Sequence, residues 1–380
     1  MGDVEQQDFI SDLPHSIIES ILTRLPIRDA LRTSILSSKW RYRWATISQL
    51  VFDENCVAFS NERSLFENSL VKFITGALFL HQGPIHKFQL STTQLQWCPD
   101  IDQWILFLSR NDIRELVLEL GEGELFRVPS CLFNCRKLTH LELFHCEFNP
   151  PLAFKGFSCL KSLNLHQVLV ASEAIESLIS SCPLLESLSL SHFDSLDLFI
   201  CAPNLKYLFL EGEFKDICLE NTPLLVSLSV AMDMTDDITE HFEQSSSCNF
   251  IQFLGGVPLL EKLVGSIYFT KGLSNTSAAV EADDLDVWEK ECPSDCTFKQ
   301  LKLVKMTDMS GVLHEMELIK FLLKSSPVLE IMSIKPCAFV RHTRQNMLIE
   351  MWTDTKLNML IELLRFRRAS AQAEIVFVQD

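Results

Sequence analysis

Leucine residues along the middle of the chain recur in a unit of the form L-x-x-L-x-L. Side chains on a strand point alternately to its two faces, so each unit predicts a short strand whose leucines face inward. Six copies are clear, and a weaker one precedes them. The copies are Ile85/Phe88/Leu90, Ile113/Leu116/Leu118, Leu138/Leu141/Leu143, Leu160/Leu163/Leu165, Leu185/Leu188/Leu190, Leu205/Leu208/Leu210 and Leu225/Leu228/Val230.

The central leucines of neighbouring clear copies lie about 20 to 25 residues apart, which is the period of leucine-rich repeats. Such repeats each add one strand to a curved parallel sheet. Cys146 follows Leu143 by three residues, where these repeats favour Asn or Cys, but the other units lack it. We therefore expect an irregular solenoid over about residues 85–265. The repeat assignment is supported by prolines that stand two residues before the opening leucine of a unit, namely Pro183, Pro203, Pro223 and Pro258.

Two polar stretches depart from the repeat. Residues 232–249 break the period and predict an insertion, followed by a helix through Phe250, Ile251 and Leu254. Residues 257–263 then resume the repeat. Residues 272–296 hold seven acidic residues against a single lysine, Lys290. This composition favours a solvated loop over an acidic docking site.

The first fifty residues have a helical period instead. Asp12 is a candidate cap for a helix that begins near Leu13 and Pro14, and Pro26 is expected to end it. A second short helix follows through residues 30–36. A third is expected to begin near Ser37, with its two tryptophans one turn apart. A segment of roughly 40 residues seldom folds alone, so its apolar side chains pack on the rest of the chain or on another protein. A longer helix is expected over residues 65–78.

The last ninety residues change character again. Residues 298–311 predict a strand, and residues 316–334 predict a helix, a turn and a further strand. The segment LLRFRRASAQAEIVFV predicts a helix end, a turn and a last strand.

Composition narrows the class of partner. The chain has 380 residues and a formal net charge of −17, which argues against nucleic acid or an anionic membrane as the main partner. The first fifty positions hold six acidic and six basic residues, and the basic residues begin only at Arg24. The polar start of the chain predicts no signal peptide. The 13 cysteines are therefore expected to be free thiols in a reducing compartment.

Catalytic and metal-binding motifs are not evident in the sequence. The run that begins at His314 lacks the second histidine of a zinc protease, and neither Cys131/Cys135 nor Cys292/Cys296 has a partner pair at zinc-finger spacing. Nucleotide-binding glycine motifs and a nucleophile elbow are also missing. We expect no cofactor, no metal and no enzymatic activity.

Three segments resemble those of plant F-box/FBD/leucine-rich-repeat proteins. Leu13-Pro14, an Ile-rich helix, Leu25-Pro26 and the run ending ILSSKWRYRW are similar to an F-box. The repeats follow, and residues 301–311, 317–323, 326–330 and 368–375 are similar to an FBD domain. The resemblance implies an α/β fold: a three-helix F-box over 8–52, an irregular leucine-rich-repeat solenoid over 53–271, and an α/β FBD domain over 297–380.

The resemblance also implies partners. An F-box docks on a Skp-type adaptor, which links it to a cullin scaffold in SCF ubiquitin ligases. Each candidate contact residue has an alternative role in holding the F-box helices together, and Ile18 and Leu31 are candidates for the interior alone. The candidate adaptor contacts are Leu13, Pro14, Ile17, Ile21, Leu22, Leu25, Pro26, Ile35, Trp40 and Trp44.

The repeats would present their strands to an unknown target protein. Candidate target contacts are residues between the strand leucines, which strand alternation turns away from the core. They are Thr139, His140, Glu142, Lys161, Asn164, Glu186, Ser189, Lys206, Tyr207 and Phe209. The expected function is therefore that of a non-catalytic substrate receptor in the cytoplasm or nucleus. The alternative is a leucine-rich-repeat scaffold that no longer recruits a ligase.

Overall fold

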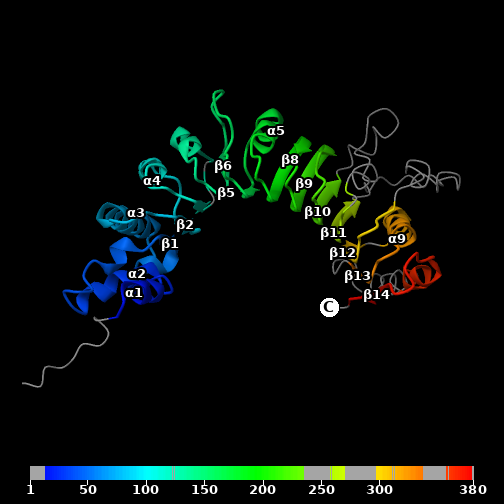
Figure 1. The fold of residues 1–380 in the computed structure, drawn as a ribbon, viewed down its shortest axis with the longest axis horizontal. Helices are drawn as coiled ribbons and strands as arrows, with labels where there is room; N and C mark the ends of the chain where they lie inside the picture. Colours follow the sequence, from blue (N-terminus) through cyan, green and yellow to red (C-terminus); the bar gives the residue numbers. More distant parts are fainter. Residues whose placement is uncertain are drawn as a thin grey trace, which may run out of the picture. The chain divides into compact units, whose positions relative to one another are not determined.

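The structure is a computed structural model in which residues 13–121, 123, 125–234, 257, 259–269, 297–309, 311, 313–336, 357 and 359–378 are described (Figure 1). The chain divides into two compact units, Met1–Ala174 and Ile175–Asp380. Asp12, the helix expected through Phe250 and the acidic stretch 272–296 lie outside the described residues, as does most of the expected insertion, of which residues 232–234 belong to a strand.

The first unit begins with short helices: α1 (His15–Leu22), α2 (Ile27–Arg32), and the 3-10 turns η1 (Thr33–Ile35) and η2 (Arg43–Thr46). Pro14 is the N-cap of α1, and no side chain caps this end. The helix ends at Leu22, so Pro26 does not end it as predicted but is the N-cap of α2. Both prolines suit these positions because the first amides of a helix need no intrahelical partner.

The prediction of a third helix from Ser37 is wrong. The amide of Trp40 bonds the carbonyl of Ser37, and the amide of Arg43 bonds that of Trp40, so each bond closes a three-residue turn. Trp40 and Trp44 are each only 4% exposed. They therefore reach the interior from turns, not from one face of an α-helix.

Five parallel strands form the sheet in the described part of the first unit. They are β1 (Gln49–Phe52), β2 (Lys87–Ser91), β3 (Glu115–Glu119), β5 (His140–Phe144) and β7 (Ser162–His166), each paired with the next. The repeat pattern identified all but β1. The central repeat residues Phe88, Leu116, Leu141 and Leu163 follow in one register and are at most 1% exposed.

Helices and turns connect these strands. They are η3 (Glu54–Cys56), α3 (Arg63–Leu80), α4 (Pro99–Ser109) and η4 (Ser130–Asn134), with a small pair β4 (Phe126–Arg127) and β6 (Cys146–Glu147). The helix predicted over residues 65–78 is confirmed as α3, although Leu65 is exposed. Figure 1 shows α3 and α4 on one side of the strands, which leaves the other face of this sheet uncovered by helices.

The ends of β5 and β7 share a backbone conformation. His145 and Gln167, each two residues after the last leucine of a repeat, have φ values of 49° and 52°. Positive φ is uncommon outside glycine, and here it turns the chain sharply away from the sheet after β5 and β7.

The second unit continues the same architecture. Its described strands are β8 (Ser187–Cys201), β9 (Tyr207–Glu220), β10 (Ser227–Met234), β11 (Lys262–Phe269), β12 (Leu303–Met309), β13 (Ile331–Pro336) and β14 (Glu374–Phe377). The helix α9 (Leu313–Ser325) lies between β12 and β13, and α5 (Ser172–Ser180) precedes β8 and spans the boundary between the two units. Every neighbouring pair among them is parallel.

The final strands do not form a separate sheet. β12 pairs directly with β11, so the segment that resembles an FBD domain extends the repeat sheet of the second unit. Its spacing is that of the repeats: Leu301, Val304 and Met306 are at most 1% exposed, and Leu329, Met332 and Ile334 are fully buried. The predicted α/β class with parallel strands is confirmed, while the domain boundaries stay predictions.

Candidate functional site

Outward side chains on the sheet of the first unit form ordered rows. Lys87 of β2, Glu115 of β3 and His140 of β5 share one register position. Gln89, Val117 and Glu142 share the position two residues further along these strands. Parallel strands lie about 4.8 Å apart, so members of a row are neighbours. This arrangement follows from the repeat itself, because the leucines between these residues occupy the buried face.

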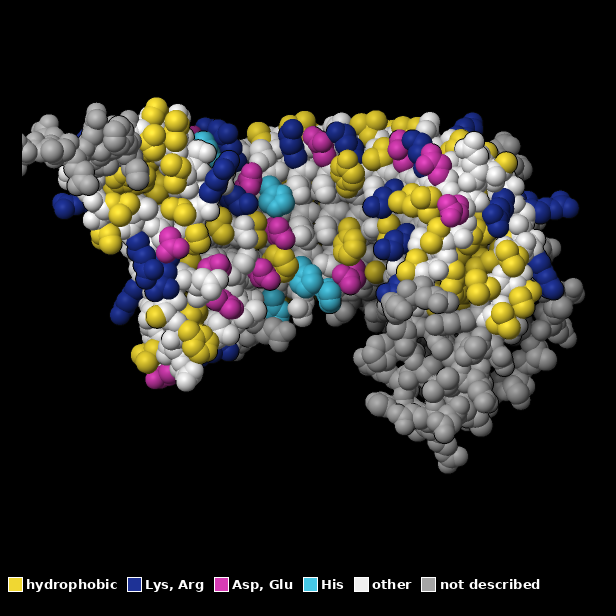
Figure 2. All heavy atoms as spheres, turned by 90° about the horizontal axis from the view of Figure 1, so that it is seen from below, with side chains coloured by type: hydrophobic (Ala, Val, Ile, Leu, Met, Phe, Trp, Pro, Cys, Tyr) yellow, Lys and Arg dark blue, Asp and Glu magenta, His cyan; other side chains and the backbone are white. Residues whose placement is uncertain are grey.

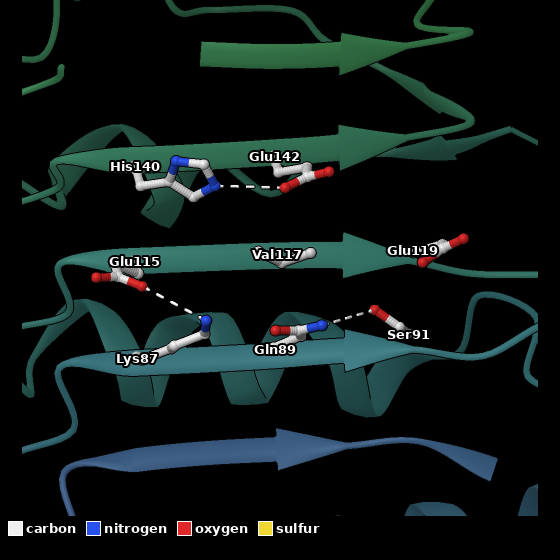
Figure 3. Close-up of a pocket in the computed structure, with 8 residues that line it drawn as sticks. All are labelled: Lys87, Gln89, Ser91, Glu115, Val117, Glu119, His140 and Glu142. Carbon is white, nitrogen blue, oxygen red and sulfur yellow. Dashed lines mark hydrogen bonds and ion pairs between the residues drawn. The ribbon is translucent and has the colours of Figure 1, made fainter. Parts of the chain in front are cut away.

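These rows surround a depression of about 390 Å³ (Figure 3). Figure 3 shows Val117 on its floor between Glu115 and Glu119 along β3. The lining residues are Lys87, Gln89, Ser91, Glu115, Val117, Glu119, His140 and Glu142.

Polar contacts hold most of these side chains in place. Lys87 Nζ lies 3.6 Å from Glu115 Oε2, and Gln89 Nε2 donates to Ser91 Oγ at 3.3 Å. His140 Nε2 lies 3.3 Å from Glu142 Oε2. Glu142 also accepts a hydrogen bond of 3.0 Å from Asn164 Nδ2 on β7. The depression therefore presents an ordered polar surface.

The sheet face of the second unit has a different chemistry. Tyr207 and Phe209 project from β9 and are 54% and 37% exposed. Serines lie opposite both rings in register, on β8 and on β10. Because serine is small, the two rings stand above their neighbours. They form an aromatic surface that an apolar group can contact.

The ten predicted target contacts divide into two kinds. His140, Glu142, Asn164, Ser189, Tyr207 and Phe209 lie on strands and in outward positions, as predicted. Thr139, Lys161, Glu186 and Lys206 each precede the first residue of a strand, so they line the edge where the strands begin. Whether any of the ten contacts a target stays a prediction.

Residues that precede a strand interact with the residues that precede the neighbouring strand. The hydroxyl of Thr139 donates to the carbonyl of Arg114 at 3.0 Å. Lys206 Nζ lies 2.8 Å from Glu186 Oε2, and this hydrogen bond raises the pKa of Lys206. Both partners are solvated, so the pair serves mainly to position its side chains.

Sequence reasoning missed the β2 and β3 side of the depression. Its residues are outward positions of the two earliest repeat copies, and the alternation that identified Glu142 applies to them equally. The predicted target contacts begin only at Thr139, next to β5, and so leave out these two strands. The missed residues are Lys87, Gln89, Ser91, Glu115, Val117 and Glu119.

The helical segment at the start of the chain presents a second candidate surface. Ile17, Ile21, Leu25 and Ile35 are 46%, 39%, 37% and 86% exposed, and the adjacent Leu36 is 65% exposed. Figure 2 shows hydrophobic side chains gathered at this end of the molecule. Pro14 and Pro26 are exposed at the starts of α1 and α2, and Leu13 is half-buried.

Three of the predicted adaptor contacts are interior residues. Leu22, Trp40 and Trp44 are 1%, 4% and 4% exposed, so they cannot touch a partner in this conformation. Apolar periodicity does not tell which side of a short helix faces its own core. Ile18, a candidate for the interior, is 2% exposed, whereas Leu31 is half-buried.

The described cysteines of the chain are free and mostly unreactive. Nine described cysteines are free thiols, and burial raises the pKa of Cys135 and of Cys146 to about 12. Cys146, beside His145, is thus a poor nucleophile because its thiolate is scarce at neutral pH. Within the described residues, no three His, Cys, Asp or Glu side chains are grouped to hold a metal, and no helix is long and apolar enough to cross a bilayer.

Three protein families match the chain in order. The F-box domain matches residues 10–49, the LRR repeats of FBD-associated F-box protein At5g56370 match residues 101–264, and FBD matches residues 289–334. These matches agree with the resemblance seen in the sequence.

Relatives match over nearly the whole chain. F-box/FBD/LRR-repeat protein At1g13570 of Arabidopsis thaliana is 55% identical over 429 aligned residues, covering 99% of this chain and 100% of the relative. FBD-associated F-box protein At5g56370 of the same plant is 29% identical over 439 aligned residues, covering 97% of this chain and 100% of the relative.

Proposed function

We propose that this chain, which belongs to the F-box/FBD/LRR-repeat family, is the substrate-recognition subunit of an SCF-type ubiquitin ligase. F-box proteins of this type are generally substrate adaptors of such ligases. In this role the F-box binds a Skp-type adaptor, and the repeats bind a target protein in the cytoplasm or nucleus. The chain positions the target and makes or breaks no bond itself.

The exposed apolar surface of the F-box is the observation that carries the proposal. Isolated exposed leucines are ordinary, but Ile17, Ile21, Leu25, Ile35 and Leu36 come from one short segment and are all more than a third exposed. Exposed apolar side chains gathered within one short segment are typical of protein-protein interaction sites. The buried residues Leu22, Trp40 and Trp44 fix the backbone that presents it.

Co-purification with a Skp-type adaptor tests the proposal. The full chain and the adaptor are co-expressed, and the tagged chain is isolated under mild conditions. The wild type should retain the adaptor, and the double variant Leu13→Ala/Pro14→Ala should lose it while its repeats stay folded. A wild type that retains no adaptor would favour the scaffold alternative. Equal retention by both would move the docking surface away from the start of α1.

A further inference from the structure

We propose that the depression on β2, β3 and β5 binds an arginine side chain of the target protein, with the guanidinium held between Glu119 and Glu142 over Val117. This inference rests on the proposed function, because it concerns the target that the receptor would recognise. It is carried by the distribution of partnered and unpartnered charge within the depression.

One half of the depression is neutralised internally. Lys87 Nζ lies 3.6 Å from Glu115 Oε2, so the ammonium of β2 offsets the nearest carboxylate of β3. Figure 3 shows this pair at one end of the depression, near the start of the strands. A charged guest gains little there, because both charges already have a partner.

The other half carries carboxylates without a cation. Glu119 is half-buried and has no side-chain partner within the described part of the chain. Glu142, with its side chain 24% exposed, contacts His140 and the amide of Asn164, and neither is a permanent cation. With a neutral imidazole, the eight lining residues hold three carboxylates and one ammonium, so the depression has a net negative charge.

The register defines the space between these two carboxylates. Glu142 is the direct partner of Val117, and Glu119 is two residues further along β3 on the same face. Diagonal neighbours of this kind have Cα atoms about 7 to 8 Å apart, a span that a guest group can bridge. Figure 3 shows Val117 on β3 across from Glu142 and before Glu119, where it offers apolar contact to an alkyl stem.

Arginine fits this geometry better than lysine. Its planar guanidinium presents five donors and can meet carboxylates along two edges, whereas a lysine ammonium is a compact, strongly hydrated point charge. A further acceptor lies opposite Val117 on β2: the Gln89 amide donates through Nε2 to Ser91, which leaves its oxygen to accept. The methylene groups of arginine would pack on Val117 while its charge meets Glu119 and Glu142.

The test uses the full chain and immobilised short peptides of random sequence with a fixed central residue. Arginine, lysine and citrulline are compared, because citrulline keeps the shape of arginine without its charge. The wild type should retain arginine peptides at least about tenfold better than citrulline peptides, with lysine between them. Glu119→Gln and Glu142→Gln should each reduce the preference for arginine at least about fivefold. Glu220→Gln removes the same charge from an exposed position in the second unit and should leave the preference unchanged.

Equal retention of arginine and citrulline peptides by the wild type would overturn the inference. Wild-type preference in both Glu119→Gln and Glu142→Gln would also overturn it. Adaptor co-purification and thermal melting of the same variants separate this result from the proposed function. Both Gln variants should fold and retain the adaptor, because they lie outside the F-box. If the wild type prefers arginine but retains no adaptor, the site stands and the receptor role fails.

Discussion

Leu141 of β5 lies directly opposite Leu163 of β7 in parallel register, and the two side chains are 0% and 1% exposed. Their neighbours in the same row, Leu116 and Phe88, are buried as completely. Each repeat therefore contributes one layer to a continuous core, and no repeat buries its leucines alone.

Replacing Leu163 with Asp should destabilise the first unit by more than about 3 kcal/mol, because the carboxylate would be buried with no cation to pair with. Circular dichroism melts of the full chain would measure it. The matched control is Leu152→Asp, since Leu152 is fully exposed and should tolerate the same charge. An unchanged melting temperature for Leu163→Asp would contradict the repeat core.

Trp44→Ala should unfold the F-box instead of removing a contact with a partner. Trp44 is 4% exposed, and truncating a buried aromatic residue costs about 3 to 5 kcal/mol. Limited proteolysis should cleave the variant within the first fifty residues, while the wild type stays protected. Trp44→Phe keeps most of the ring and should be protected substantially. Full protection of Trp44→Ala would place the tryptophan outside the core.

Cysteine reactivity should separate by burial. Burial raises the pKa of Cys146 from 9.0 to about 12, and the same cause raises that of Cys56 to about 11. At pH 8 the native protein should therefore label quickly at the exposed Cys218 and very slowly at these two. Mass spectrometry after brief alkylation measures this order. Rapid labelling of Cys146 would contradict it, and Cys218→Ser should remove the label at that site.

The same shifts predict a loss of stability in alkaline solution. The unfolded chain releases the thiol proton of Cys146 near pH 9.0, whereas the folded chain keeps it to about pH 12. Above pH 9 the folded state thus binds more protons, and the free energy of unfolding must fall as the pH rises through this window. Cys146→Ala should lower the stability at neutral pH but flatten this pH dependence. An equal slope in both proteins would show that other groups cause it.

The sheet was predictable from the sequence because its signal repeats. Leu188, Leu208 and Leu228 are buried for the same reason at the same spacing, so each copy supports the next. β1 was missed although Ile47, Leu50 and Phe52 follow the same spacing and are at most 2% exposed, because this strand directly follows a segment dominated by a helical period. The final strands were assigned to a separate domain although Val304 and Met332 obey the same spacing. Family resemblance there outweighed the period.

The candidate surfaces were less predictable than the core. Strand alternation identifies which residues face outward, but only the register shows that Glu142 lies opposite Val117 and diagonal to Glu119. In the F-box, Ile17 and Leu22 look equally apolar in the sequence, yet one is 46% exposed and the other 1%. That difference arises from packing between α1 and the turn at η2, which no local pattern encodes.

The affinity of the full chain for a Skp-type adaptor, measured by calorimetry, tests the central claim most directly. Ile35→Asp places a charge on the apolar surface, and Phe79→Asp does so on α3 at almost the same exposure, 86% against 85%. The wild type and Phe79→Asp should bind alike, and Ile35→Asp should bind at least about 30-fold more weakly, since an interface anchor of this kind contributes about 2 kcal/mol or more. A wild type that does not bind, or an Ile35→Asp variant that binds as well as Phe79→Asp, would contradict the account.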